Sequence, residues 1–164
     1  MKTLIAPTPT IEWKNGQVRL IDQTKLPLEE SYIDTDDYQV VCDAIYRLAI
    51  RGAPAIGVAG AYACVLAANK IESDNIDGFL KEFLMKADEI GATRPTAVNL
   101  MWAVKQMKEK AASFSGNIKD LKSSLLDLAN EIKDDDTIKL ESDSTISNNI
   151  NRRSARYIKN SNFI

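Results

Sequence analysis

The hydrophobic and polar positions of the first 35 residues predict a small β-sheet. Apolar and polar side chains partly alternate over residues 11–14 and 17–22, as they do in strands with one buried face. Asn15 and Gly16 separate the two runs, and Asn-Gly is the preferred two-residue turn of a β-hairpin. Residues 32–33 can add a short third strand. A sheet of this size needs a second surface to pack against, so we expect the following helices to cover it.

From residue 36 onward the apolar residues recur every three or four positions, which predicts helices. The stretches run over about 36–49, from the turn at Pro54 to about residue 70, from a cap at 73–75 to Gly91, from Pro95 to about 112, and from 118 to 132. Oxygens of residues 34–36 can cap the first of them. Trp13 and Trp102 fall on the apolar faces, and we interpret both as packing residues.

The character of the chain changes after residue 133, where it becomes polar and rich in Ser and Asn. Isoleucines at 146, 150 and 158 keep a helical spacing, which predicts a last helix with weak intrinsic support. The arginines at 152, 153 and 156 are interpreted as a solvated face. Together the patterns predict an α+β fold that is mostly helical: a small antiparallel sheet over 1–35, a helical bundle over 36–133 and a connecting segment over 134–164.

Composition restricts the class of protein. A length of 164 residues fits one domain of ordinary size, and the net charge of −2 argues against a general electrostatic hold on nucleic acid or an anionic membrane. No apolar run approaches the ~20 residues that span a bilayer, and the proline at position 7 interrupts the short apolar start. We therefore expect a cytoplasmic protein without nucleic-acid or membrane partners.

The chain contains no histidine, which excludes Ser-His and Cys-His nucleophilic pairs and histidine metal sites within it. The two cysteines, Cys42 and Cys64, lie in apolar helical patterns and match no metal motif, so we expect buried thiols. No metal and no cofactor is predicted.

Two short segments predict an anion-binding site. In the first, Arg51 and Gly52 precede a helix whose first turn contains Pro54. In the second, Arg94 stands directly before Pro95, which can also open a helix. A helix N-terminus carries unpaired N–H groups and about half a positive charge, and an arginine adds donors that match phosphate or carboxylate. Two such arginines suggest one anionic site approached from two sides.

A structural interpretation of the same segments stays open. An arginine near a helix start is more often a surface or salt-bridge residue, because it repels the positive end of the helix dipole. The small residues at 55, 57, 59, 60, 61 and 63 can likewise serve close helix packing instead of ligand approach.

Three long motifs resemble the N-terminal half of the S-methyl-5-thioribose-1-phosphate isomerases of methionine salvage. They are IEWKNGQVRLIDQTKLP at 11–27, DAIYRLAIRGAPAIGVAGAYA at 43–63 and TRPTAVNLMWAV at 93–104. The wider superfamily includes ribose-1,5-bisphosphate isomerases and the regulatory subunits of eukaryotic initiation factor 2B. The amino-acid sequences of the second and third motifs are typical of the isomerase branch.

The resemblance implies that Arg51, Gly52, Ala53 and Arg94 hold the phosphate and sugar of a phosphorylated ribose. It also implies an aldose-to-ketose isomerisation without a metal, carried out by a cysteine and an aspartate of a second, Rossmann-like domain. Family chains are roughly twice as long, and neither Cys42 nor Cys64 matches the catalytic position. No catalytic residue is therefore assigned in this chain. Residues 151–158 only weakly resemble the family's connecting helix.

Three hypotheses follow from the resemblance. The chain is the substrate-holding part of an isomerase and is inactive alone; or it is one half of a split enzyme that a separate C-terminal domain completes. In the third, it is a non-catalytic module that senses a sugar phosphate or nucleotide, like the subunits of initiation factor 2B. A homo-oligomer is a further possibility in each case.

Overall fold

The computed structural model describes residues 9–141, and the side chains of residues 9–135. Three strands come first and five α-helices follow, which confirms the predicted α+β fold. The elements are β1 (Ile11–Lys14), β2 (Gln17–Ile21), the short 3-10 helix η1 (Gln23–Lys25), β3 (Tyr32–Thr35), α1 (Tyr38–Tyr46), α2 (Ala53–Lys70), α3 (Ile76–Ala92), α4 (Val98–Ser113) and α5 (Ile118–Glu141). The last predicted helix and the three arginines near it lie outside the described residues.

The sheet is antiparallel with the order β1-β2-β3, and the predicted Asn-Gly turn joins its first two strands. Asn15 and Gly16 have φ angles of 53° and 78°, which a two-residue hairpin turn requires. Alternate residues of β2, Val18 and Leu20, are fully buried against the helices. Trp13 of β1 packs on Tyr62 of α2 with ring centroids 5.7 Å apart, so it is a packing residue as expected.

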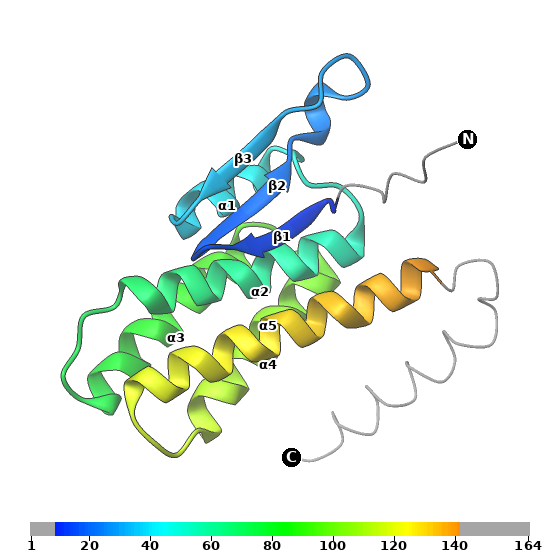
Figure 1. Cartoon of the computed structure of the whole chain (residues 1–164). Coiled ribbons are helices and arrows are strands. Elements are labelled where there is room, and N and C mark those ends of the chain that lie inside the picture. Colours follow the sequence, from blue (N-terminus) through cyan, green and yellow to red (C-terminus); the bar gives the residue numbers. More distant parts are fainter. Residues whose placement is uncertain (1–8, 142–164) are drawn as a thin grey trace.

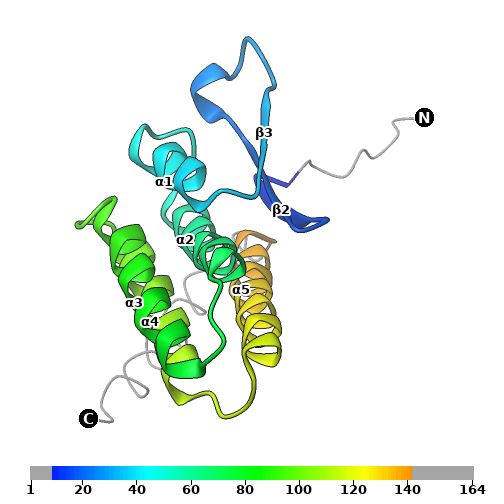
Figure 2. The ribbon, with the colours of Figure 1, turned by 90° about the vertical axis from the view of Figure 1, so that its left-hand side faces the viewer.

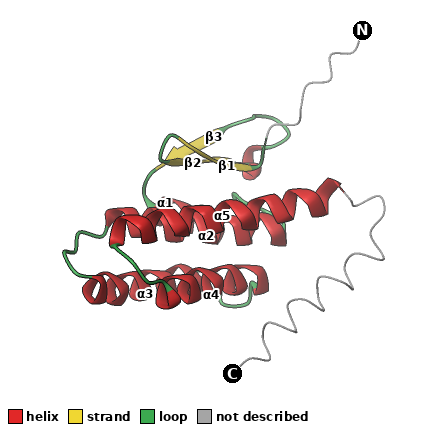
Figure 3. Cartoon of the chain, turned by 60° about the horizontal axis from the view of Figure 1, so that its bottom comes forward, coloured by secondary structure: helices red, strands yellow, loops and turns green. Residues whose placement is uncertain are grey.

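Helix α2 is the centre of the molecule. Every residue from Ile56 to Ala68 is buried, because its small side chains let other elements pack close to its backbone. Figure 2 looks nearly along the helix axes and shows α2 between α1, α3 and α5. Figure 3 shows the layers: the sheet covers one side of α2 and α5, and α3 and α4 lie on the other side.

Helix α1 is shorter than predicted at both ends. Its N-cap is Asp37, whose carboxylate accepts from the N–H of Gln39, so residues 34–36 do not cap it. It ends in a Schellman motif, in which the N–H of Ala49 donates to Ala44 O and the N–H of Leu48 donates to Ile45 O. The left-handed residue of this motif, usually glycine, is Leu48 with φ 64°. Leu48 fits the apolar spacing of the predicted helix, but its left-handed backbone ends the helix.

Helix α3 ends at Ala92, one residue after the predicted end at Gly91. Gly91 is buried, and a methyl group there would meet Val104 of α4 at an ordinary 3.6 Å. The change of composition at residue 134 does not end α5, which continues to Glu141. Of the predicted buried thiols, Cys64 is buried and Cys42 is half-buried, and both are free. Trp102 packs partly buried against the core, as expected.

Candidate anion-binding site

Helices α2 and α4 run parallel and in close contact, so they begin at the same end of the bundle. A Cβ atom at Gly57 would lie 3.2 Å from the carbonyl oxygen of Asn99, near the start of α4. One turn later, a Cβ atom at Gly60 would overlap the side chain of Leu100. The absence of side chains at these two glycines lets the backbones approach. The segments predicted to form the anion site are thereby brought to one end of the molecule.

The start of α2 has no side-chain cap. Its N-cap residue is Gly52, with φ 90° and ψ 131°, a conformation that residues with a side chain rarely adopt. The first helical hydrogen bond runs from the N–H of Ile56 to Gly52 O. The N–H groups of Ala53 and Ala55 therefore have no partner within the helix, and Pro54 between them has no N–H to offer.

Arg51 is exposed at this start, and the structure shows both of its anchor points. Its backbone N–H donates to Oε1 of Gln23 at 2.6 Å. Its side-chain Nε donates to the carbonyl oxygen of Leu48 at 3.3 Å. The guanidinium is thus fixed through Nε to the loop that precedes α2, and this hydrogen bond leaves its two terminal nitrogens available to an anion.

Arg94 lies farther from its helix than predicted. Pro95 does not open α4 but occupies the second position of a turn that the N–H of Ala97 closes on Arg94 O at 3.0 Å. The helix begins at Val98, and its N-cap residue Ala97 has no side-chain acceptor. The side chain of Arg94 is half-buried and forms no hydrogen bond or ion pair within residues 9–135. Arg94 therefore precedes a second helix start without a side-chain cap, as predicted, but Pro95 lies in the turn before the helix and not in its first turn.

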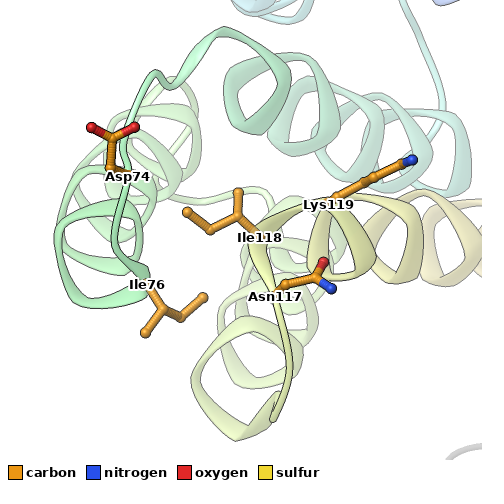
Figure 4. A pocket seen from close by; sticks show the side chains of 5 residues that line it. All are labelled: Asp74, Ile76, Asn117, Ile118 and Lys119. Atoms are coloured by element: carbon orange, nitrogen blue, oxygen red, sulfur yellow. The ribbon is translucent and has the colours of Figure 1, made fainter.

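The opposite end of the bundle is built differently. There α3 and α5 begin, and each has its own asparagine cap: Asn75 accepts from the N–H of Gly78 at 2.7 Å, and Asn117 accepts from the N–H of Asp120 at 2.8 Å. A shallow hollow of about 410 Å³ lies between these two starts. Figure 4 shows two isoleucines, Ile76 and Ile118, facing it while the charged ends of Asp74 and Lys119 point away from one another.

A second hollow, of about 760 Å³, runs along α3 and α4 and reaches the turn after Arg94. Its lining is mostly apolar and includes Pro95, Val98, Met101 and Trp102. Val98 is 78% exposed. An ion pair between Lys108 and Asp88 lies at its edge. The apolar walls suit an apolar group, and the charged residues that line the rest of the hollow include acids as well as lysines, among them Asp88 and Glu109 beside Lys105 and Lys108.

The sheet supports the loop before α2 through residues that the sequence did not single out. Asp22 is 4% exposed, and its carboxylate accepts from Thr24 and from Nη1 of Arg47, the latter at 3.1 Å. The hydrogen bond from the Thr24 hydroxyl, assisted by Arg47, lowers the pKa of Asp22 although burial opposes this. Contacts of this kind join residues far apart in the sequence and therefore have no local signature.

Neither of the two thiols is activated, although Cys42 lies beside Thr93, the neighbour of Arg94. Burial raises the pKa of Cys42 and that of Cys64, so both stay protonated at neutral pH and neither is an activated nucleophile. Within the described residues no three His, Cys, Asp or Glu side chains gather as they would around a metal ion. Among the helices of residues 9–141, none is long and apolar enough to cross a bilayer.

Comparison with known proteins confirms the resemblance found in the motifs. The model of the Initiation factor 2 subunit family matches residues 49–164. The methylthioribose-1-phosphate isomerase of Syntrophotalea carbinolica is 46% identical over 123 residues, which is 74% of this chain and 36% of that protein. That of Pelotomaculum thermopropionicum is 53% identical over 102 residues, or 62% of this chain and 28% of that protein. The chain thus spans about a third of the length of these relatives.

Solved structures share the fold. The 5-methylthioribose 1-phosphate isomerase from Pyrococcus horikoshii superposes with a TM-score of 0.76 at 31% identity, covering 79% of this chain and 37% of that one. The translation initiation factor eIF-2B, subunit delta, from A. fulgidus superposes with a TM-score of 0.74 at 35% identity, covering 79% and 38%. The fold is therefore shared by both branches.

Proposed function

The chain belongs to the Initiation factor 2 subunit family, and from this we propose that its helical part holds the substrate phosphate of a methylthioribose-1-phosphate isomerase. One observation carries the proposal: two parallel helices without side-chain caps begin at the same end of the bundle, and an arginine precedes each start. The isomerase relatives favour this branch of the family.

Each group has a defined part in this proposal. The N–H groups of Ala53 and Ala55 donate to phosphate oxygens, and the helix dipole favours the negative charge there. Gly52 provides the positive φ that turns the chain into α2; a Cβ atom at this position would meet nothing within 4 Å, so the backbone conformation, and not crowding, requires glycine. Arg51 and Arg94 add charge-assisted hydrogen bonds.

The chemical step requires groups that we do not assign in this chain. Isomerisation of an aldose 1-phosphate needs a proton donor or acceptor at the sugar ring, and the described thiols are protonated and buried or half-buried. We propose that the chain alone binds the sugar phosphate without converting it. Steady turnover of 5-methylthioribose 1-phosphate by the purified chain would contradict this part of the proposal.

Titration calorimetry with 5-methylthioribose 1-phosphate tests the binding. Arg51→Ala and Arg94→Ala should each weaken it about tenfold or more, because each removes charge-assisted hydrogen bonds. The matched control is Lys81→Ala, which removes one exposed positive charge from α3 and should leave the affinity unchanged. Equal affinity in the parent and both arginine variants would remove the phosphate site.

The similarity to the subunit of eIF-2B keeps a second candidate, a regulatory module that binds a nucleotide or sugar phosphate. Its discriminating test is complementation. Adding the remaining part of an isomerase relative should restore turnover if the chain is the substrate-holding part or one half of a split enzyme. Binding without turnover in that mixture favours the regulatory module.

A further inference from the structure

Gln23 contacts the loop before α2 at two points. Its backbone N–H donates to the carbonyl oxygen of Ala49 at 2.8 Å, and its side-chain Oε1 accepts the N–H of Arg51 at 2.6 Å. Gln23 belongs to η1, the short helical turn that follows β2 (Figure 1), and its side chain joins this segment to the residue directly before the central helix.

The loop that Gln23 contacts contains two residues with unfavourable backbone conformations. Leu48 at its beginning and Gly52 at its end have positive φ angles of 64° and 90°. A left-handed leucine is strained, and such conformations persist only where the surrounding structure fixes them. Arg51 and Gly52 are themselves exposed, so packing contributes little to holding Arg51 in place.

We propose that Gln23 is a positioning residue for the phosphate site: its side-chain oxygen fixes the Arg51 backbone and, through it, the direction of the guanidinium and of the first N–H groups of α2. This inference rests on the proposed function. The neighbouring ion pair between Asp22 and Arg47 anchors the same loop to the sheet at its other end. Gln23 itself contacts the loop and acts on the ligand only through Arg51.

The first arm of the test needs no ligand. We compare Gln23→Met, which keeps the length of the side chain and removes the acceptor, with Gln39→Met, the same change at an exposed position of α1. In the 164-residue chain, hydrogen exchange of the Arg51 amide should speed up about threefold to tenfold in the first variant and stay unchanged in the second. Gln23→Glu restores an acceptor and should restore the slow exchange.

The second arm measures the affinity for 5-methylthioribose 1-phosphate. Gln23→Met should weaken binding about threefold to tenfold, a loss of the size of one hydrogen bond. Because Gln23 acts through Arg51, the double variant with Arg51→Ala should lose clearly less than the product of the two single losses. A residue with a merely structural role would lower the melting temperature without this coupling.

The outcomes separate the two proposals. Unchanged Arg51 exchange in Gln23→Met, or fast exchange in Gln23→Glu, overturns the role of the Gln23 oxygen whatever the ligand does. Full, independent losses in the double variant also overturn it. If Arg51→Ala alone binds the sugar phosphate like the parent, the proposed function fails, and the exchange result still decides whether Gln23 holds the loop.

Discussion

The two ends of the helical bundle satisfy their helix starts in opposite ways. At the end where α3 and α5 begin, Asn75 and Asn117 accept the N–H groups of their own helices. At the end where α2 and α4 begin, the N-cap residues are Gly52 and Ala97, which offer no acceptor. The first end is complete by itself, whereas the second end presents N–H groups beside two arginines. Under the proposed function, this difference favours the end where α2 and α4 begin as the anion-binding end.

The uncapped end is also held from outside. Side chains of the segment that follows β2, Asp22 and Gln23, anchor the loop before α2, while the capped starts rely on residues of their own segments. Long-range anchoring leaves the helix N–H groups unoccupied, because the anchoring bonds end on the loop instead of on the helix. Four substitutions test this contrast, and their expected effects decrease from Gly60 to Ala97.

Removing the close approach of α2 and α4 should have the largest effect. Gly60→Ala forces a methyl group onto the buried Leu100 side chain and should destabilise the chain by about 1–3 kcal/mol. The control is Gly91→Ala, where the methyl group has room and the gain in helix propensity should stabilise the chain by about 0.5–1 kcal/mol. Urea unfolding measures both, and a Gly60→Ala chain as stable as the parent would refute the close packing of these helices.

Removing the anchor in the sheet should come next. Asp22→Asn loses the charged hydrogen bond to Arg47 and should cost about 1.5 kcal/mol at neutral pH. Because the pKa of Asp22 is lowered below its ordinary value of 3.8, its contribution is complete above that value and is lost as the pH falls through the folded-state pKa. Unfolding measured across this range should therefore show the parent and the variant converging below about pH 4. A constant difference at all pH values would contradict the assignment.

At the capped end, Asn117→Ala should cost about 1 kcal/mol, because the N–H of Asp120 loses its acceptor. Asn117→Ser keeps an acceptor and should recover most of the stability. Neither change should alter the affinity for 5-methylthioribose 1-phosphate, since this end lies opposite the arginines. A loss of affinity in thermal or calorimetric titration would place the anion at the wrong end for our account.

The smallest effect is a gain. Ala97 has the extended backbone of an N-cap, with φ −80° and ψ 98°, so Ala97→Ser should cap α4 and stabilise the chain by about 0.5–1 kcal/mol. The new hydroxyl should also compete for the N–H groups that we assign to the phosphate, which lowers the affinity severalfold. Ala112→Ser, at the exposed far end of α4, serves as the control. Higher stability with unchanged affinity would remove the start of α4 from the site.

Local patterns predicted the elements well and their ends poorly. The Asn-Gly hairpin, the central small-residue helix and the change from sheet to helix depend on short-range chemistry, and all were predicted correctly. The prediction that Pro95 opens α4 was wrong, because a proline has the same φ in a turn and in the first turn of a helix. Gly91 was predicted to end α3, and the helix ends one residue later, at Ala92.

The candidate site was only half accessible from the sequence. Arg51 and Arg94 were found because each precedes a proline near a helix start, a local signal. The side-chain contact of Gln23 with Arg51 joins residues that are far apart in the sequence, and no local rule points to it. The left-handed Leu48 was hidden for a related reason: its apolar side chain continues the helical spacing while the backbone leaves the helix.

The most direct measurement follows the amide resonances of the isotopically labelled chain during titration with 5-methylthioribose 1-phosphate. Our account predicts saturable shifts of the amides of Ala53 and Ala55 at the start of α2 and of Val98 and Asn99 at the start of α4. The amides of Gly78 and Asp120, which the asparagine caps occupy, should stay in place. Saturable shifts at Gly78 and Asp120 without any at Ala53 and Ala55 would contradict the account.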